Sequence, residues 1–135
     1  MSLQYSVALR NAQLDQMETT IGASAILYLR SGAPPADCAT ADSGTLISTI
    51  SLPADWMAAA ASGSKAKSGT WQDTSADAAG TLGHFRIKDS TGTTCHAQGT
   101  ITATGGGGDM TVDNTSVAAG QTITVNSFTL SAGNA

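Results

Sequence analysis

The stretch TCHAQGTITAT, residues 94–104, alternates between two kinds of side chain along its whole length. Small or apolar residues occupy every second position and face one way. Threonine, histidine and glutamine occupy the positions between them, and Thr104 is the last of these. A period of two is typical of a β-strand that turns one face toward a core. This stretch therefore predicts the most regular strand of the chain and a fold centred on a β-sheet.

A second strand is predicted just before it. Residues 84–88 (HFRIK) alternate, with Phe85 and Ile87 expected inside and Arg86 and Lys88 outside. The connection DSTGT, residues 89–93, holds a glycine and favours a hairpin between the two strands.

Further strand signals lie on both sides of this hairpin, separated by turn-rich stretches. We expect strands at residues 25–30, 45–52, 65–73, 110–112 and 123–130, and loops at residues 31–44, 76–83 and 113–121. Residues 55–61 fit either a helical turn or a small-residue strand. Gly105 to Gly108 are interpreted as a hairpin tip. The apolar positions change parity between Val125 and Phe128, which predicts a β-bulge.

The N-terminal part has a different period. Residues 6–21 predict a helix that Ser6 caps and that stops at Gly22. Its apolar stripe is Val7, Leu14, Met17 and Ile21, and its polar face holds Arg10, Gln13, Asp15 and Glu18. The stripe is expected to pack either on the same domain or on a partner subunit.

These signals together predict an all-β fold, a β-sandwich or jelly roll of six to eight strands with one N-terminal helix. Residues 1–22 form the N-terminal helical segment and residues 23–135 the β-sandwich domain in this interpretation.

The composition narrows the function classes. Only 12% of the residues are charged, about half of the usual fraction near 25%, and the net charge is −4. Six lysines and arginines cannot build a basic patch for nucleic acid or an anionic membrane. The start of the sequence does not have the pattern of a signal peptide, and we expect a cytosolic origin with Cys38 and Cys95 as reduced, unlinked thiols.

Five stretches resemble a group of small proteins encoded by tailed bacteriophages. They are LQYSVALRNAQLDQMETTIG (3–22), LRSGAPPADCATADSG (29–44), LPADWMAAAASGSKAKSGTW (52–71), GHFRIKDSTGTTCHAQGTI (83–101) and GDMTVDNTSVAAGQTITVNSFTLS (108–131). The resemblance covers nearly the whole chain and implies a role in the virion, without naming the part. Small β-sandwich proteins of phages often act as capsid cement, also called decoration protein, which adds an analogy at the level of the fold. The group supplies no catalytic residues to carry over.

Candidate catalytic and metal-binding residues do not form a recognisable motif. Cys38, Cys95, His84 and His96 are the soft metal ligands of the chain, but their spacing is not that of a zinc site. The loop aspartates are expected to bond turn backbone, as such residues usually do; they are Asp37, Asp42, Asp73, Asp77, Asp89, Asp109 and Asp113. We therefore predict no catalytic, metal or cofactor site and no enzyme.

The two tryptophans have two interpretations. Trp56 and Trp71 are expected to anchor a core or an interface, and the alternative is that they stack on a sugar. The glycine run 105–108 is not a phosphate-binding loop, since no Lys-Ser/Thr pair follows it.

The functional hypothesis is a virion structural protein assembled in the bacterial host cytoplasm, most simply a capsid cement that bridges capsid subunits. Its partners would be the major capsid protein or other virion subunits and further copies of itself, with no nucleic acid and no membrane. The alternatives are another virion part, such as a tail, connector or fibre component, or a carbohydrate-binding adhesion module.

Overall fold

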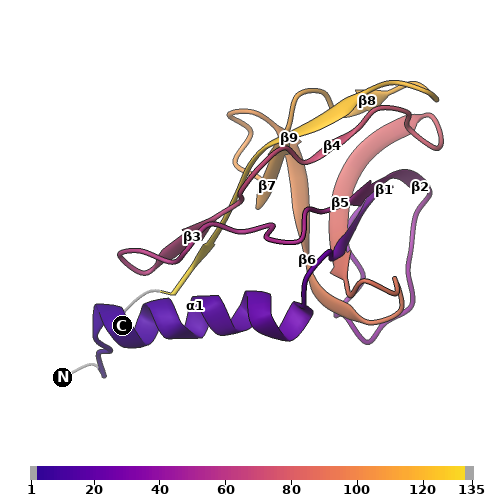
Figure 1. Ribbon diagram of the computed structural model, residues 1–135. Helices are drawn as coiled ribbons and strands as arrows, with labels where there is room; N and C mark the ends of the chain where they lie inside the picture. Colours follow the sequence, from indigo (N-terminus) through magenta and orange to yellow (C-terminus); the bar gives the residue numbers. More distant parts are fainter. Residues whose placement is uncertain (1–2, 133–135) are drawn as a thin grey trace.

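The computed structural model describes residues 3–132, which form a mostly β structure with one N-terminal helix (Figure 1). The elements in chain order are α1 (Val7–Ile21), β1 (Ile26–Ser31), β2 (Leu46–Ser51), β3 (Ser64–Ala66), β4 (Gln72–Asp73), β5 (Gly80–Lys88), β6 (Cys95–Ala103), β7 (Met110–Val112), β8 (Ser116–Val117) and β9 (Ile123–Ser131). The expected fold class, all-β with a helix in front, is confirmed.

The strands form one curled sheet in the order β2-β1-β5-β6-β7-β9-β3, with β4 paired to β9 and β8 paired to β5 (Figure 1). The nine strands that residues 3–132 form exceed the expected six to eight because β4 and β8 have two residues each, too few to show alternation. The expected loops 76–83 and 113–121 accordingly contain the start of β5 and the whole of β8. Residues 55–61 form neither alternative, since they are irregular apart from single bridges at Met57 and Ala61.

An aromatic cluster holds the core together. Trp71 stands 5.7 Å from Phe128 and 6.0 Å from Trp56, measured between ring centroids. Phe85 meets Phe128 edge to face at 5.4 Å. Both tryptophans are fully buried, which confirms them as core anchors. Contacts of this kind add about 0.5–1.5 kcal/mol each beyond the burial of apolar area.

The bulge predicted near the C-terminus is present in β9. Thr111 pairs with Ser127, but Val112 pairs with Val125, so Asn126 is the extra residue. It brings both Val125 and Phe128 into the core, although they are an odd number of residues apart.

The glycine run does not form a hairpin tip, and that prediction was wrong. Strand β7 runs parallel to β6, so residues 104–109 must turn the chain back beside the strand it has just left. The return is close: a Cβ at Gly108 would lie 2.8 Å from the Thr102 nitrogen. Glycine is needed here because the backbones approach too closely for a side chain.

Helix α1 begins and ends where the sequence predicts. The Leu9 amide donates to Ser6 Oγ at 3.1 Å, and Gly22, at φ +94°, donates its amide to the Glu18 carbonyl. The apolar stripe is only half right. Leu14 and Ile21 are buried, whereas Val7 and Met17 are 47% and 44% exposed.

The helix lies on its own chain largely through polar side chains that the sequence places on the face opposite the apolar stripe. Asp15 and Glu18 both bind the ammonium group of Lys65, at 2.7 and 3.0 Å. Glu18 also accepts the Met57 amide, and Arg10 donates to the Ala132 carbonyl. The reason is that irregular backbone near residues 57–63 leaves amides without a strand partner, and the helix supplies their acceptors.

Candidate interaction surface

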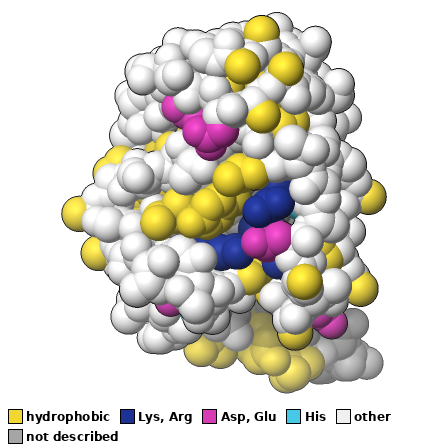
Figure 2. Space-filling model, turned by 90° about the vertical axis from the view of Figure 1, so that its right-hand side faces the viewer, with side chains coloured by type: hydrophobic (Ala, Val, Ile, Leu, Met, Phe, Trp, Pro, Cys, Tyr) yellow, Lys and Arg dark blue, Asp and Glu magenta, His cyan; other side chains and the backbone are white. Residues whose placement is uncertain are grey.

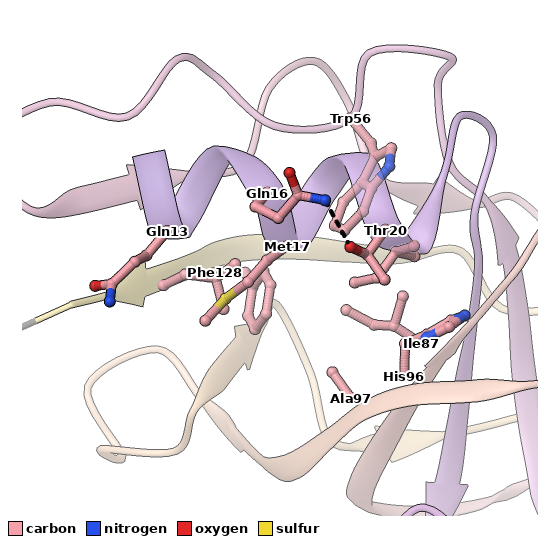
Figure 3. A pocket seen from close by; sticks show the side chains of 11 residues that line it. Gln13, Gln16, Met17, Thr20, Trp56, Ile87, His96, Ala97 and Phe128 are labelled. Carbon is pink, nitrogen blue, oxygen red and sulfur yellow. Dashed lines mark hydrogen bonds between the residues drawn. The ribbon is translucent and has the colours of Figure 1, made fainter. Parts of the chain in front are cut away.

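An apolar groove lies between α1 and part of the sheet. It has a volume of about 410 Å³, and both the helix and strands β5, β6 and β9 line it. In Figure 3 the Met17 side chain extends from the helix toward Phe128, with Ile87 and Ala97 farther along the sheet side. The polar lining consists of Gln13, Gln16, Thr20 and His96. Among residues 3–132, no lysine, arginine, aspartate or glutamate lines the groove, so it suits an uncharged, largely apolar occupant.

A second hollow continues the groove between β6 and β9. It has a volume of about 460 Å³ and shares Ala97, Phe128 and Leu130 with the first. It exists because β7 is only three residues long and pairs with just the last part of β6, Ile101–Ala103. Beyond β7, the facing edges of β6 and β9 separate.

These edges leave backbone groups available for pairing. Within residues 3–132, the part of β6 from Cys95 to Thr100 pairs with β5 alone, and residues 129–131 of β9 pair with β3 alone. One edge position is closed by a side chain: Asp109 accepts the Thr100 amide at 2.9 Å. Open edges are places where another strand can add to a sheet.

The exposed hydrophobic side chains gather at the same end of the molecule. Every large hydrophobic residue that the described structure leaves exposed belongs to residues 3–17, on α1 or just before it. They are Leu3, Tyr5, Val7, Leu9 and Met17, with exposures of 69%, 40%, 47%, 46% and 44%. Scattered exposed hydrophobics need no explanation, but a concentration on one element beside an apolar groove indicates an interaction site.

A charged cluster lies on a different side of the sheet. The β1–β2 loop, residues 32–45, folds over β5 and brings Asp42 against three cations: Arg86 at 2.7 Å, Lys88 at 2.8 Å and Arg30 at 3.3 Å. Lys88, by hydrogen bonding, lowers the pKa of Asp42 to about 2, helped by Arg86 and opposed by burial. Figure 2 shows basic and acidic side chains meeting in a hollow of the face that carries β1, β2 and β5.

Arg86 was expected outside and is 2% exposed, so that prediction was wrong. Its guanidinium donates to the carbonyls of Asp37 and Thr40 and to Gln98 Oε1, besides Asp42. Alternation shows which residues share a face, but it does not show that a loop covers the outer one.

The soft metal ligands do not converge. His84 is fully buried and donates from Nδ1 to the Gly32 carbonyl at 2.9 Å, while His96 is exposed on the groove. The thiols of Cys38 and Cys95 do lie together. Within residues 3–132, no three histidine, cysteine or acidic side chains meet in a geometry that could hold a metal ion.

Most of the loop aspartates behave as the sequence predicts. Asp37 accepts the amide and hydroxyl of Thr40, and Asp89 accepts the amides of Thr93 and Thr94. Asp73 and Asp113 likewise accept nearby backbone amides. Asp77 and Asp109 do not follow the prediction, since Asp77 accepts the Thr49 hydroxyl of β2 and Asp109 accepts the Thr100 amide and hydroxyl of β6. Asp42 is different, since its partners are the three cations.

Sequence reasoning found only part of the candidate interaction surface. Met17 and Val7 were singled out, but as residues to be buried. Leu3, Tyr5 and Leu9 were missed because they lie outside the stripe, and their signal was the density of apolar residues near the start of the chain.

Comparisons with known protein families, with curated proteins and with solved structures each find no match. None of the helices formed by the described residues is both long enough and apolar enough to cross a membrane.

Proposed function

We propose that this chain is a structural protein of a tailed-phage particle, without enzymatic activity, and that it acts as capsid cement between shell subunits. The observation that carries the proposal is the concentration of exposed hydrophobic side chains on and just before α1, next to an uncharged groove. The resemblance of the sequence to small phage proteins suggests which kind of partner occupies that surface.

The physical argument starts from what the surface can bind. Covering a large apolar side chain contributes about 1.5–3 kcal/mol when burial is complete. The exposed hydrophobic residues follow one another along residues 3–17, and Met17 among them lines the groove. A neutral lining offers no ion pair to a charged ligand, so the fitting partner is an apolar segment of a neighbouring virion subunit. A protein that binds only the assembled shell stabilises it by mass action.

The rival interpretations differ in what they need. A tail, connector or fibre component would use the same surface at another position in the particle. A carbohydrate-binding module would need an aromatic face open to a sugar, and the two tryptophans are fully buried. The buried tryptophans favour a protein partner over a glycan.

The test is binding of the purified protein to phage particles that lack it, measured by co-sedimentation. Met17→Glu places a charge at the groove and should weaken binding about tenfold or more. Ala12→Glu is the matched control, because it adds the same charge to the same helix about 140° around its axis. Equal binding by both variants, or no binding by the wild type, contradicts the proposal.

A further inference from the structure

The two cysteines come from distant parts of the chain and meet where the β1–β2 loop crosses the sheet. Cys95 is the first residue of β6, and Cys38 lies in the middle of the loop. The loop on either side of Cys38 is bonded to Arg86 of β5 and Gln98 of β6, close to Cys95, and the two thiols interact with each other. The Cys95 thiol donates to the Ala97 carbonyl at 3.6 Å, and both side chains are half-buried and free of a disulfide.

This meeting is built by contacts on both sides of Cys38. Arg86 donates to the carbonyls of Asp37 and Thr40, both at 2.8 Å, so it holds the backbone just before and just after the cysteine. Gln98, which pairs with Arg86 across β5 and β6, donates to the Pro35 carbonyl at 2.7 Å. The loop is thereby fixed over the strands that position Cys95.

We propose that Cys38 and Cys95 form a reversible disulfide that locks the β1–β2 loop onto β6. The oxidant is a low-molecular-weight disulfide such as glutathione disulfide. One cysteine thiolate attacks it and releases one small thiol, which leaves a mixed disulfide. The second cysteine, as thiolate, then attacks the protein sulfur of that mixed disulfide and releases the other small thiol. In total the two protein thiols lose two protons and two electrons, and the small disulfide becomes two thiols.

The alternative function of a thiol pair is to bind a metal ion, which would need further ligands beside the two sulfurs. His96 adjoins Cys95 in the strand but lines the groove, and His84 is bonded to the loop carbonyl of Gly32. Within the described residues, no third side chain joins the two sulfurs as a metal ligand. Because the two thiols have no further ligand with which to bind a metal, the chemistry open to the pair is the formation of a disulfide between them.

The surroundings affect the order of the steps. Burial first, and then the neighbouring Cys38 thiol, raise the pKa of Cys95 to about 12, although Arg86 and Lys88 act in the opposite direction. Cys95 is therefore protonated at neutral pH and a poor first attacker, and it must lose its proton before it attacks the mixed disulfide. We expect Cys38 to open the small disulfide and Cys95 to close the bond to it.

The disulfide fits a protein that moves between redox compartments. Reducing cytosol keeps the pair as thiols, and oxidising surroundings outside the cell close it. This inference goes beyond the proposed function and does not depend on it, since the thiol pair belongs to the isolated chain.

The test equilibrates the purified native protein in buffers of increasing ratio of oxidised to reduced glutathione. Mass spectrometry without reduction should show an intramolecular link between the Cys38 and Cys95 peptides, with the chain lighter by two hydrogen atoms. The melting temperature should rise by roughly 10 °C and fall again with dithiothreitol. Cys38→Ser and Cys95→Ser should each abolish the rise.

The wild-type mass decides the matter even if a serine variant folds poorly. Two free thiols at the most oxidising ratio, links only between separate chains, or a link that forms only in denaturant would each overturn the proposal.

Discussion

The ammonium group of Lys65 lies 2.7 Å from a carboxylate oxygen of Asp15, and only 2% of the lysine side chain is exposed. A buried charge on β3 thus depends on α1 for its counter-ions, because Glu18 supplies the second one at 3.0 Å. The helix is therefore attached to its own domain by more than its two buried hydrophobic residues.

Lys65→Met should lower the free energy of unfolding by about 2 kcal/mol or more, because it removes the ammonium group that binds two carboxylates and the Ala58 carbonyl. Lys67→Met is the control, since the Lys67 ammonium group donates to the Gly69 carbonyl near the surface and lies over the Trp71 ring. Urea denaturation measures both. Equal losses of unfolding free energy in the two variants would show that the contact of Lys65 with the helix stabilises the fold no more than the surface contacts of Lys67.

Leu14→Ala should cost about 2–4 kcal/mol, since Leu14 is fully buried under the helix. Met17→Ala, three residues on, should cost about 0.5 kcal/mol or less, because that side chain is 44% exposed. Thermal melting of the isolated protein compares them. A helix that packed only on a neighbouring subunit would make the two variants alike in isolation.

Acid stability should depend on Asp42. Its pKa in the folded protein, about 2, lies below the ordinary value of 3.8, so the ionised form is favoured by folding. That stabilisation is present above about pH 4 and is lost as the pH falls from there toward 2. Asp42→Asn should therefore lower the melting temperature at pH 7 and reduce the decline between pH 4 and pH 2.

The control for this pH profile is Asp55→Asn, which removes an exposed carboxylate outside the cluster. Asp89, whose pKa is also about 2 because of its bonds to Thr91 and to backbone amides, contributes equally in both proteins. Acid profiles of the same slope for the two asparagine variants would contradict the assigned role of Asp42.

The wild-type protein should self-associate as its concentration rises, because low charge, open strand edges and exposed hydrophobic residues favour contacts between copies. Sedimentation velocity measures this, and Met17→Glu should shift the distribution toward monomer. A protein that stays monomeric at every concentration, and also leaves particles unbound, would count against an interaction surface on α1.

Local features of the fold were readable in the sequence. Ser6 and Gly22 marked the ends of α1, Trp71 marked a core position, and the parity change before Phe128 marked the bulge at Asn126. Each of these leaves its signal within a short stretch of the sequence, which is why a period or a cap residue reveals it.

Features set by distant parts of the chain were not readable. The burial of Arg86 depends on the β1–β2 loop, and the inward polar face of α1 depends on amides near Met57 and Gly63. The parallel pairing of β6 with β7 and the proximity of Cys38 to Cys95 are likewise set by the tertiary structure. Alternation assigns a residue to a face but does not show what covers that face.

The most direct measurement is quantitative mass spectrometry of purified phage particles from the lysate in which this chain is produced, with a labelled copy located by electron microscopy. The account predicts many copies per particle, bound at the head shell. Absence of the protein from the particles would contradict a structural role, and a label confined to the tail would contradict the cement role.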